Sequence, residues 1–209
     1  MGDRIPLGHR AHRRDPDTRG GGPMSTLLTA TPGQTVGPFF GYALPFDRCH
    51  ELVPPSSPNA VQLSGIVTDG DGRPVPDALL EIWQADVDGT VPRAAGSLHR
   101  DGFTFTGWGR ASTGDDGRYS FSTVIPGPTS PGTAPFILVT VFARGLLNRL
   151  FTRAYVPGDH LGEDPLLASL PAERRETLIA TRDEGGLRFD VSLQGPRETV
   201  FLRYPGQQR

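Results

Sequence analysis

Short apolar segments separated by turns rich in glycine and proline run from residue 61 to residue 204, and this pattern restricts the fold more than any other feature. Residues 61–69, VQLSGIVTD, alternate apolar and polar side chains and end at the turn DGDGRPVPD. Alternation with period two is typical of a half-buried β-strand. With 27 Gly and 21 Pro in 209 residues and no repeat period, we expect a loop-rich β-protein.

The same reading places the other elements. Asp164 can cap a helical segment within residues 163–178, with Pro165 at its first helical position. Many short strands with regular turn signals favour a mainly β, antiparallel β-sandwich with one short helical segment and long loops. We expect residues 1–24 to be a disordered tail and residues 25–209 to form one domain. Further strands are expected at residues 78–86, 118–125, 151–156, 177–181, 187–193 and 199–204, the last three as an antiparallel meander.

One segment, residues 133–145 (TAPFILVTVFARG), differs from the others. Between Phe136 and Phe142 it is almost wholly apolar, and it ends at Arg144 and a glycine. Such a run is either a strand buried on both faces or a short core helix, and its β-branched residues favour the strand. Arg144 is a charged residue just beyond the end of this apolar strand, and its role there needs an explanation.

Charge and cysteine content exclude several classes of protein. The formal net charge of −2 gives no reason to expect nucleic acid or a membrane surface as a partner. No stretch approaches the ~20 apolar residues of a membrane span, and the Arg-rich N-terminus lacks the apolar core of a secretory signal. Cys49 is the single cysteine, and we interpret it as a free thiol in a reducing, cytoplasmic compartment.

Two segments resemble a known family. LSGIVTDGDGRPVPDALLEIWQADVDG (63–89) and STGDDGRYSFSTVIPGPTSPG (112–132) are similar to the intradiol ring-cleaving dioxygenases. Four further segments narrow the resemblance to the alpha chains of members that are built from homologous alpha and beta chains. These are TPGQTVGPFF (31–40), VTVFARGLLNRLFTRAYVPGD (139–159), RRETLIA (174–180) and RETVF (197–201).

The resemblance implies a chemistry that this chain has lost. In the family, two tyrosinates and an H-x-H pair hold Fe(III), because hard anionic oxygen donors favour the ferric state. The matching positions here are Val91 and Thr129 for the tyrosines and Phe136 and Leu138 for the histidines. A catalytic arginine of the family matches Thr133. We therefore expect no metal on this chain and an apolar filling of the site, with each buried Phe or Leu stabilising the fold by ~2 kcal/mol.

The remaining candidate donors do not restore a metal site. Outside the tail, which holds His9 and His12, the histidines are His50, His99 and His160, and no two of them have the spacing of metal ligands. Tyr119 and Tyr155 lie in strand patterns and are expected in the core. Trp83 is expected to be a buried aromatic anchor of a core or an interface.

The resemblance also implies a role for a chain without iron. A homologous beta subunit would hold the Fe(III), and this chain would line the substrate pocket with Thr35, Gly37, Pro38 and Arg144. Gly37 lets backbone approach a ligand, and an arginine offers charge to the carboxylate of an aromatic acid. The reaction implied is the opening of protocatechuate between its hydroxyls, with O₂, to 3-carboxy-cis,cis-muconate.

Alternatives remain at this point. Arg144 could be a solvated strand-end arginine paired with a surface carboxylate, and Thr35 could be a turn hydroxyl that bonds its own backbone. The GIVTDGDGRPVPDALLEI stretch alone would also fit a non-catalytic, transthyretin-like binding module. A third possibility is a self-sufficient dioxygenase with relocated ligands, against which the missing H-x-H counts.

Overall fold

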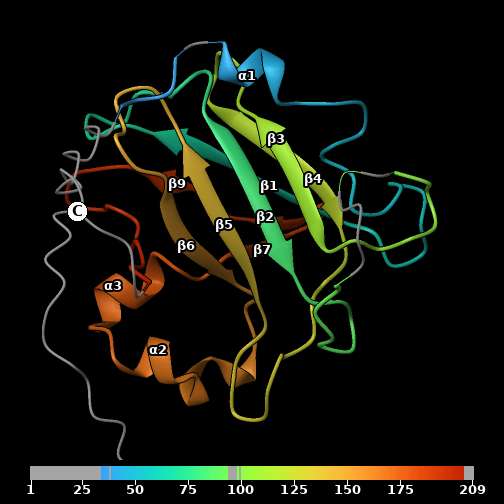
Figure 1. Ribbon diagram of the computed structural model, residues 1–209. Coiled ribbons are helices and arrows are strands. Elements are labelled where there is room, and N and C mark those ends of the chain that lie inside the picture. Colours follow the sequence, from blue (N-terminus) through green and yellow to red (C-terminus); the bar gives the residue numbers. More distant parts are fainter. Residues whose placement is uncertain (1–33, 38, 94–97, 99, 205–209) are drawn as a thin grey trace, which may run out of the picture. The chain divides into compact units, whose positions relative to one another are not determined.

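The computed structural model describes residues 34–37, 39–93, 98 and 100–204, and it forms two packed β-sheets (Figure 1). The expectation of a disordered tail at residues 1–24 therefore lies outside the described residues. One sheet has the order β4-β1-β8-β7, with β9 also paired to β1, and the other has the order β3-β2-β5-β6. The strands are β1 (Val61–Thr68), β2 (Leu79–Gln84), β3 (Trp108–Ser112), β4 (Arg118–Thr123), β5 (Phe136–Phe142), β6 (Leu150–Tyr155), β7 (Thr181–Asp183), β8 (Gly186–Arg188) and β9 (Val191–Ser192).

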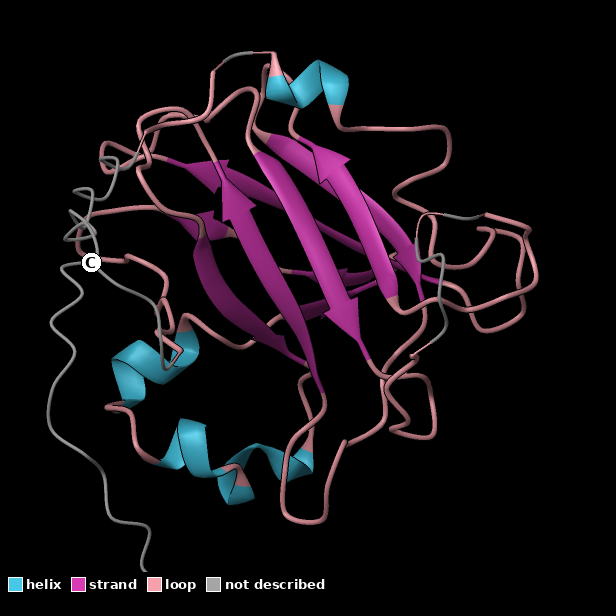
Figure 2. Cartoon of the chain, in the orientation of Figure 1, coloured by secondary structure: helices cyan, strands magenta, loops and turns pink. Residues whose placement is uncertain are grey.

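In the described part of the chain, four short helices lie at the ends of the sheets (Figure 2). The α1 helix (Phe40–Ala43) was not expected from the sequence, and it lies at the opposite end from the others. The η1 helix (Asp159–Glu163), α2 (Pro165–Ala168) and α3 (Ala172–Glu176) replace the single helical segment expected at residues 163–178. The predicted cap is confirmed, because the Asp164 carboxylate accepts hydrogen bonds from the backbone N–H groups of Leu166 and Leu167, with Pro165 at the helix start.

The core lies between the two sheets, as expected for a sandwich. Alternate residues of each strand point inward, so the apolar positions of the sequence pattern meet at the centre. Tyr119 is confirmed as a core residue, and Tyr155 is wholly buried in a second cluster beneath α2. The inward residues of the main cluster include Leu63, Val67, Leu80, Ile82, Phe121, Ile137, Val139, Val141, Ala154, Leu187 and Val191.

The β5 strand confirms the strand reading of its apolar run but not its burial on both faces. Ile137, Val139 and Val141 are wholly buried against the other sheet. The alternate positions Phe136 and Leu138 face outward and are only half-buried. The run is therefore apolar on its outer face as well, although no layer formed by the described residues covers that face fully.

The segment 187–193 agrees only in part with the antiparallel strand that its pattern predicted, because β8 does pair antiparallel with β7 across the expected turn. Leu187 and Val191 are buried as expected, but the segment divides into β8 and β9, and both pair with β1 in parallel. Side chains interrupt the ladder at the division: the Asp190 carboxylate accepts from the N–H of Ile66, and the Tyr119 hydroxyl donates to the carbonyl of Phe189.

The two flanking segments of the expected meander are also mostly not strands. Residues 199–204 make one isolated bridge, between Leu202 and Phe151, because successive backbone groups bond to different neighbours. The N–H of Thr199 donates to Ser192, and the N–H of Val200 donates to the Thr177 hydroxyl. Of residues 177–181, only the last belongs to a strand.

Gly65 of β1 is required by the close packing at this division. A Cβ at Gly65 would overlap the carbonyl of Phe189 and press on the Tyr119 hydroxyl. We expect Gly65→Ala to lower the free energy of unfolding by about 3 kcal/mol, since neither backbone can move away without breaking its ladder. Urea denaturation measures this, with Gly37→Ala as a control at a glycine whose Cβ would meet no atom within 4 Å. Equal stability of the two variants would contradict the prediction.

No helix in the described part of the chain is long and apolar enough to cross a membrane.

Candidate functional site

The structure brings together two of the elements that the sequence suggested for a pocket. The hydroxyl of Thr35 accepts a hydrogen bond of 2.7 Å from the N–H of Gly145, the residue that follows Arg144. The alternative reading of Thr35, as a turn hydroxyl bonding its own backbone, is therefore wrong. This bond fixes the loop at residues 34–37 beside the turn after β5.

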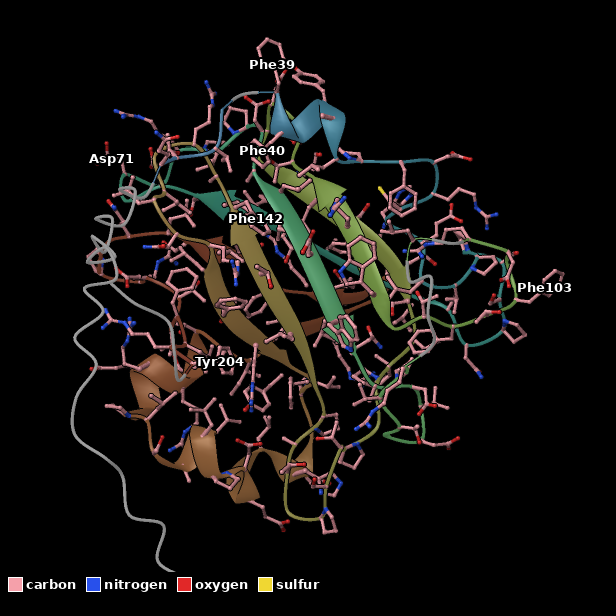
Figure 3. All side chains as sticks on the ribbon, in the orientation of Figure 1. Phe39, Phe40, Asp71, Phe103, Phe142 and Tyr204 are labelled. Carbon is pink, nitrogen blue, oxygen red and sulfur yellow. The ribbon has the colours of Figure 1, made fainter. Side chains whose placement is uncertain are left out.

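The α1 helix, which follows this loop in the chain, is held by β3. The Ser112 hydroxyl donates to the carbonyl of Gly41 at 3.1 Å, and the Arg110 guanidinium donates to the carbonyl of Leu44 at 2.7 Å. Both donors lie on the outer face of the sheet, near the end that bears Phe142 (Figure 3). The sequence analysis missed α1, whose aromatic-rich stretch FFGYALPF was the available signal.

Arg144 lies two residues beyond β5 and is half exposed. Its guanidinium pairs with the Asp77 carboxylate at 3.0 Å, and the two side chains are 51% and 29% exposed. In the isolated chain, Arg144 thus makes the surface ion pair that the sequence analysis considered as its alternative role. Such a pair contributes at most about 1 kcal/mol, so the arginine can exchange this partner for another at low cost.

Gly37 is exposed, and a Cβ on it would meet no atom of this chain within 4 Å. Nothing within the described chain therefore requires a glycine at this position. Pro38, the other loop residue suggested for the pocket, lies outside the described residues. The role of Gly37 in letting backbone approach a ligand remains a proposal about what this loop meets in a complex.

The positions that match the family's iron ligands lie at the other end of β5. Phe136 and Leu138 share the outer face of the sheet, while Ile137 between them points into the core. Val91 is 40% exposed, and Thr129 is exposed. The expectation that hydrocarbon fills this place as ordinary core holds only in part. The strand register turns both side chains away from the main core and leaves them half-buried, but Phe136 packs against the second buried cluster, which contains Tyr155.

The loops that would carry the missing tyrosines still pack against each other. The N–H of Gly127 donates to the carbonyl of Asp86 at 2.8 Å. Gly89 has a φ of +84° and approaches the carbonyl of Pro128 so closely that no Cβ would fit. The loop that carries Val91 and the loop that carries Thr129 are therefore packed together in this chain.

These side chains do not fit a ferric ion. Val91, Phe136 and Leu138 offer no donor atom, and Thr129 offers one neutral hydroxyl. Thr133, at the position of the family's catalytic arginine, donates its hydroxyl to the carbonyl of Ser130 at 2.7 Å. Within the described ranges, no three or more His, Cys, Asp or Glu residues gather as a group that could hold a metal.

A guanidinium occupies the outer face beside these positions. Arg153 of β6 lies over the ring of Phe136, 4.1 Å from its centroid, and its register partner is Leu138. It donates to the Tyr155 hydroxyl at 3.1 Å, which donates in turn to Asp164 at 3.0 Å. A positive charge held by the Tyr155 hydroxyl therefore lies beside Phe136 and Leu138.

Tyr155 gives this network a pH dependence. Burial, first, and the Asp164 charge raise the pKa of Tyr155 to about 12 from an ordinary 10.0, although Arg153 acts in the opposite direction. The protonated phenol is thus favoured in the folded state, and its stabilisation is complete below pH 10 and lost as the pH rises through about 12. We expect the free energy of unfolding to fall in this window, and Tyr155→Phe to flatten the fall, as chemical denaturation at stepped pH would show. An unchanged slope in the variant would contradict the assignment.

Trp83 lies on the same outer face and is 41% exposed, so the expectation of a buried core anchor is wrong for this chain. Its register partners are Leu138 and Trp108, and alternation along β2 turns the indole outward. Whether it anchors an interface stays a prediction.

This chain is similar to known proteins. A family model described as a dioxygenase (Dioxygenase_C) matches residues 37–195. The protocatechuate 3,4-dioxygenase alpha chain of Burkholderia cepacia is 43% identical over 196 residues, covering 85% of this chain and 98% of that one. The chain belongs to the intradiol ring-cleaving dioxygenase family.

Other members of this dioxygenase family show both kinds of chain. The alpha chain from Pseudomonas putida is 35% identical, with 85% of this chain and 98% of that chain covered. The protocatechuate 3,4-dioxygenase beta chain of Burkholderia cepacia is 34% identical, with 68% of each chain covered. The family's fold is also seen in an intradiol ring-cleavage dioxygenase from Tetranychus urticae, with a TM-score of 0.53, 17% identity and coverages of 72% and 88%.

Proposed function

We propose that this chain is the alpha subunit of a protocatechuate 3,4-dioxygenase and that it completes a substrate pocket on a homologous, iron-holding beta subunit. The high identity to alpha chains over almost their whole length supports this role. The existence of a homologous beta chain in the same family supports a hetero-oligomer. The fold and the free Cys49 are compatible with a cytoplasmic enzyme.

A pocket shared between chains is supported by the distance between Phe136 and Arg144, which lie at opposite ends of β5. The strand alone spans about 20 Å, with Phe136 at one end and Phe142, followed by Arg144, at the other. Arg144 therefore lies too far from this chain's own degenerate positions to serve them. Its exposed guanidinium and the neighbouring Thr35 loop would instead contact another chain.

Pairing of two homologous sandwiches about an approximate two-fold axis would use this arrangement. In such an interface contacts are reciprocal, so if the Arg144 end of one chain meets the Phe136 end of its partner, the reverse contact forms as well. The Arg144 end of this chain would then face the iron of the beta subunit, and the Phe136 end would face the corresponding end of beta. Each alpha–beta pair would have one productive pocket.

In that pocket, an iron held by the beta subunit would activate the substrate toward O₂. This chain's residues act on the other end of the substrate. Arg144 would bind the carboxylate of protocatechuate with a charge-assisted hydrogen bond and so orient the ring. Thr35 holds the turn that carries Arg144, through its bond to the N–H of Gly145.

Co-expression with the beta chain tests the role. We expect one complex of both chains that consumes O₂ with protocatechuate and releases 3-carboxy-cis,cis-muconate, and no turnover by this chain alone. Turnover of a catechol by the chain alone would favour the self-sufficient enzyme. A beta chain that is fully active and unaffected by this chain would favour the transthyretin-like binding module, which the match over residues 37–195 argues against.

A further inference from the structure

We infer that Arg153 excludes metal cations from this chain's degenerate site, so that restoring histidines at positions 136 and 138 is not sufficient to bind a metal. The inference rests on the match of these two positions to the family's ligands, but not on the proposed partner. Two obstacles would then prevent metal binding at this site: the missing donor atoms and the positive charge of Arg153.

The position of Arg153 is the first support. Cross-strand partners on one face of an antiparallel pair have Cβ atoms about 5 Å apart. Arg153 is the partner of Leu138, and its guanidinium lies 4.1 Å from the ring centroid of Phe136. One cation thus covers both positions from which the family's imidazoles would project.

The second support is that the guanidinium is held in place. Its bond to Tyr155 continues to Asp164, which also accepts from the N–H groups of Leu166, Leu167 and Ala134. Asp164 is 2% exposed and belongs to the start of α2. Arg153 is therefore tied through one phenol to a buried helix cap and cannot simply swing into solvent.

The third support is the charge state of the cluster. Burial lowers the pKa of Arg153, but Tyr155 and then Tyr204, through hydrogen bonds and charge, raise it by more, so the guanidinium remains protonated. The Arg153 Nε is buried without a hydrogen-bond partner among the described residues. Close to this charge, a bound divalent or trivalent ion would be repelled.

The test compares metal affinity in a chain that has regained two donors. The starting protein is the full chain with Phe136→His and Leu138→His, and the probe is Zn(II), which neutral imidazoles bind well. Adding Arg153→Gln is expected to tighten Zn(II) binding at least tenfold in calorimetric titration. Adding Arg149→Gln serves as the matched control, because Arg149 lies over Phe151 at the far end of β6, and it should leave the affinity unchanged.

Two further variants separate charge from shape and protect the test against misfolding. Arg153→Lys keeps the charge and should leave Zn(II) binding as weak as in the starting protein. Arg153→Met removes the charge with an unbranched side chain that can pack on Phe136, and it should tighten binding as Gln does; thermal unfolding confirms that each variant is folded. Equal affinity with Arg153 and with its neutral replacements, whether strong or weak, would overturn the inference, as would tight binding by the lysine variant.

Discussion

Arg144→Ala, made in the complex with the beta subunit, is expected to lower kcat/KM for protocatechuate by about 10- to 100-fold. A hydrogen bond between charged groups contributes about 1.5–3 kcal/mol, which corresponds to this range. The loss should be smaller for catechol, which has no carboxylate for the guanidinium to bind. Initial rates of O₂ uptake with the two substrates measure both effects.

The stability of the variant distinguishes this role from a purely structural one. The ion pair of Arg144 with Asp77 is half exposed, so its loss should cost at most about 1 kcal/mol of unfolding free energy. Arg188→Ala is a matched control, since Arg188 makes a similar exposed pair with Asp190 at 2.9 Å, on the other sheet. If Arg144→Ala and Arg188→Ala left kcat/KM equally unchanged, Arg144 would be a surface arginine and no part of a pocket.

Asp164→Ala is expected to cost about 4 kcal/mol of unfolding free energy, the largest effect on stability among the substitutions considered. The carboxylate is 2% exposed and joins three segments. It accepts from two N–H groups of α2, from the N–H of Ala134 and from the Tyr155 hydroxyl. Its removal leaves several buried donors without partners, each of which costs about 1–3 kcal/mol, partly relieved by local movement. Guanidinium denaturation measures the loss.

Asp164→Asn provides a graded comparison, because the amide oxygen can keep part of these bonds. It should fall between the wild type and the alanine variant. Asp159→Ala, an exposed acidic residue at the start of η1, should change stability by less than about 0.5 kcal/mol. An alanine variant of Asp164 as stable as that of Asp159 would show that the cap does not hold the helices against the sheet.

The sequence predicts the fold well where a strand follows the period-two pattern between clear turns. β1, β2, β4 and β5 lie within the expected ranges, and the Asp164 cap begins α2 as expected. Prediction from the sequence fails where tertiary contacts determine the backbone conformation. The pattern of residues 187–193 cannot show that the Asp190 carboxylate, rather than a backbone carbonyl, accepts from Ile66. The apolar residues of β5 also do not show which face of that strand is covered.

The candidate site is predictable only in part for the same reason. The sequence alone shows that the family's ligands are replaced by Val91, Thr129, Phe136 and Leu138. Only the strand structure shows that Phe136 and Leu138 face outward. The contact of Thr35 with Gly145 joins residues 110 positions apart. Arg153 gives no signal in the sequence, because its relation to Phe136 arises from the pairing of β5 with β6.

The most direct test of the account is the iron content of the chain by itself and in its complex. Elemental analysis of the chain purified alone should find no stoichiometric ferric ion, and its spectrum should lack tyrosinate-to-iron absorption. The complex with the beta subunit should contain one iron for each alpha–beta pair. A stoichiometric ferric ion in the isolated chain, or two in each pair, would contradict the claim that this chain shapes a pocket whose metal another chain holds.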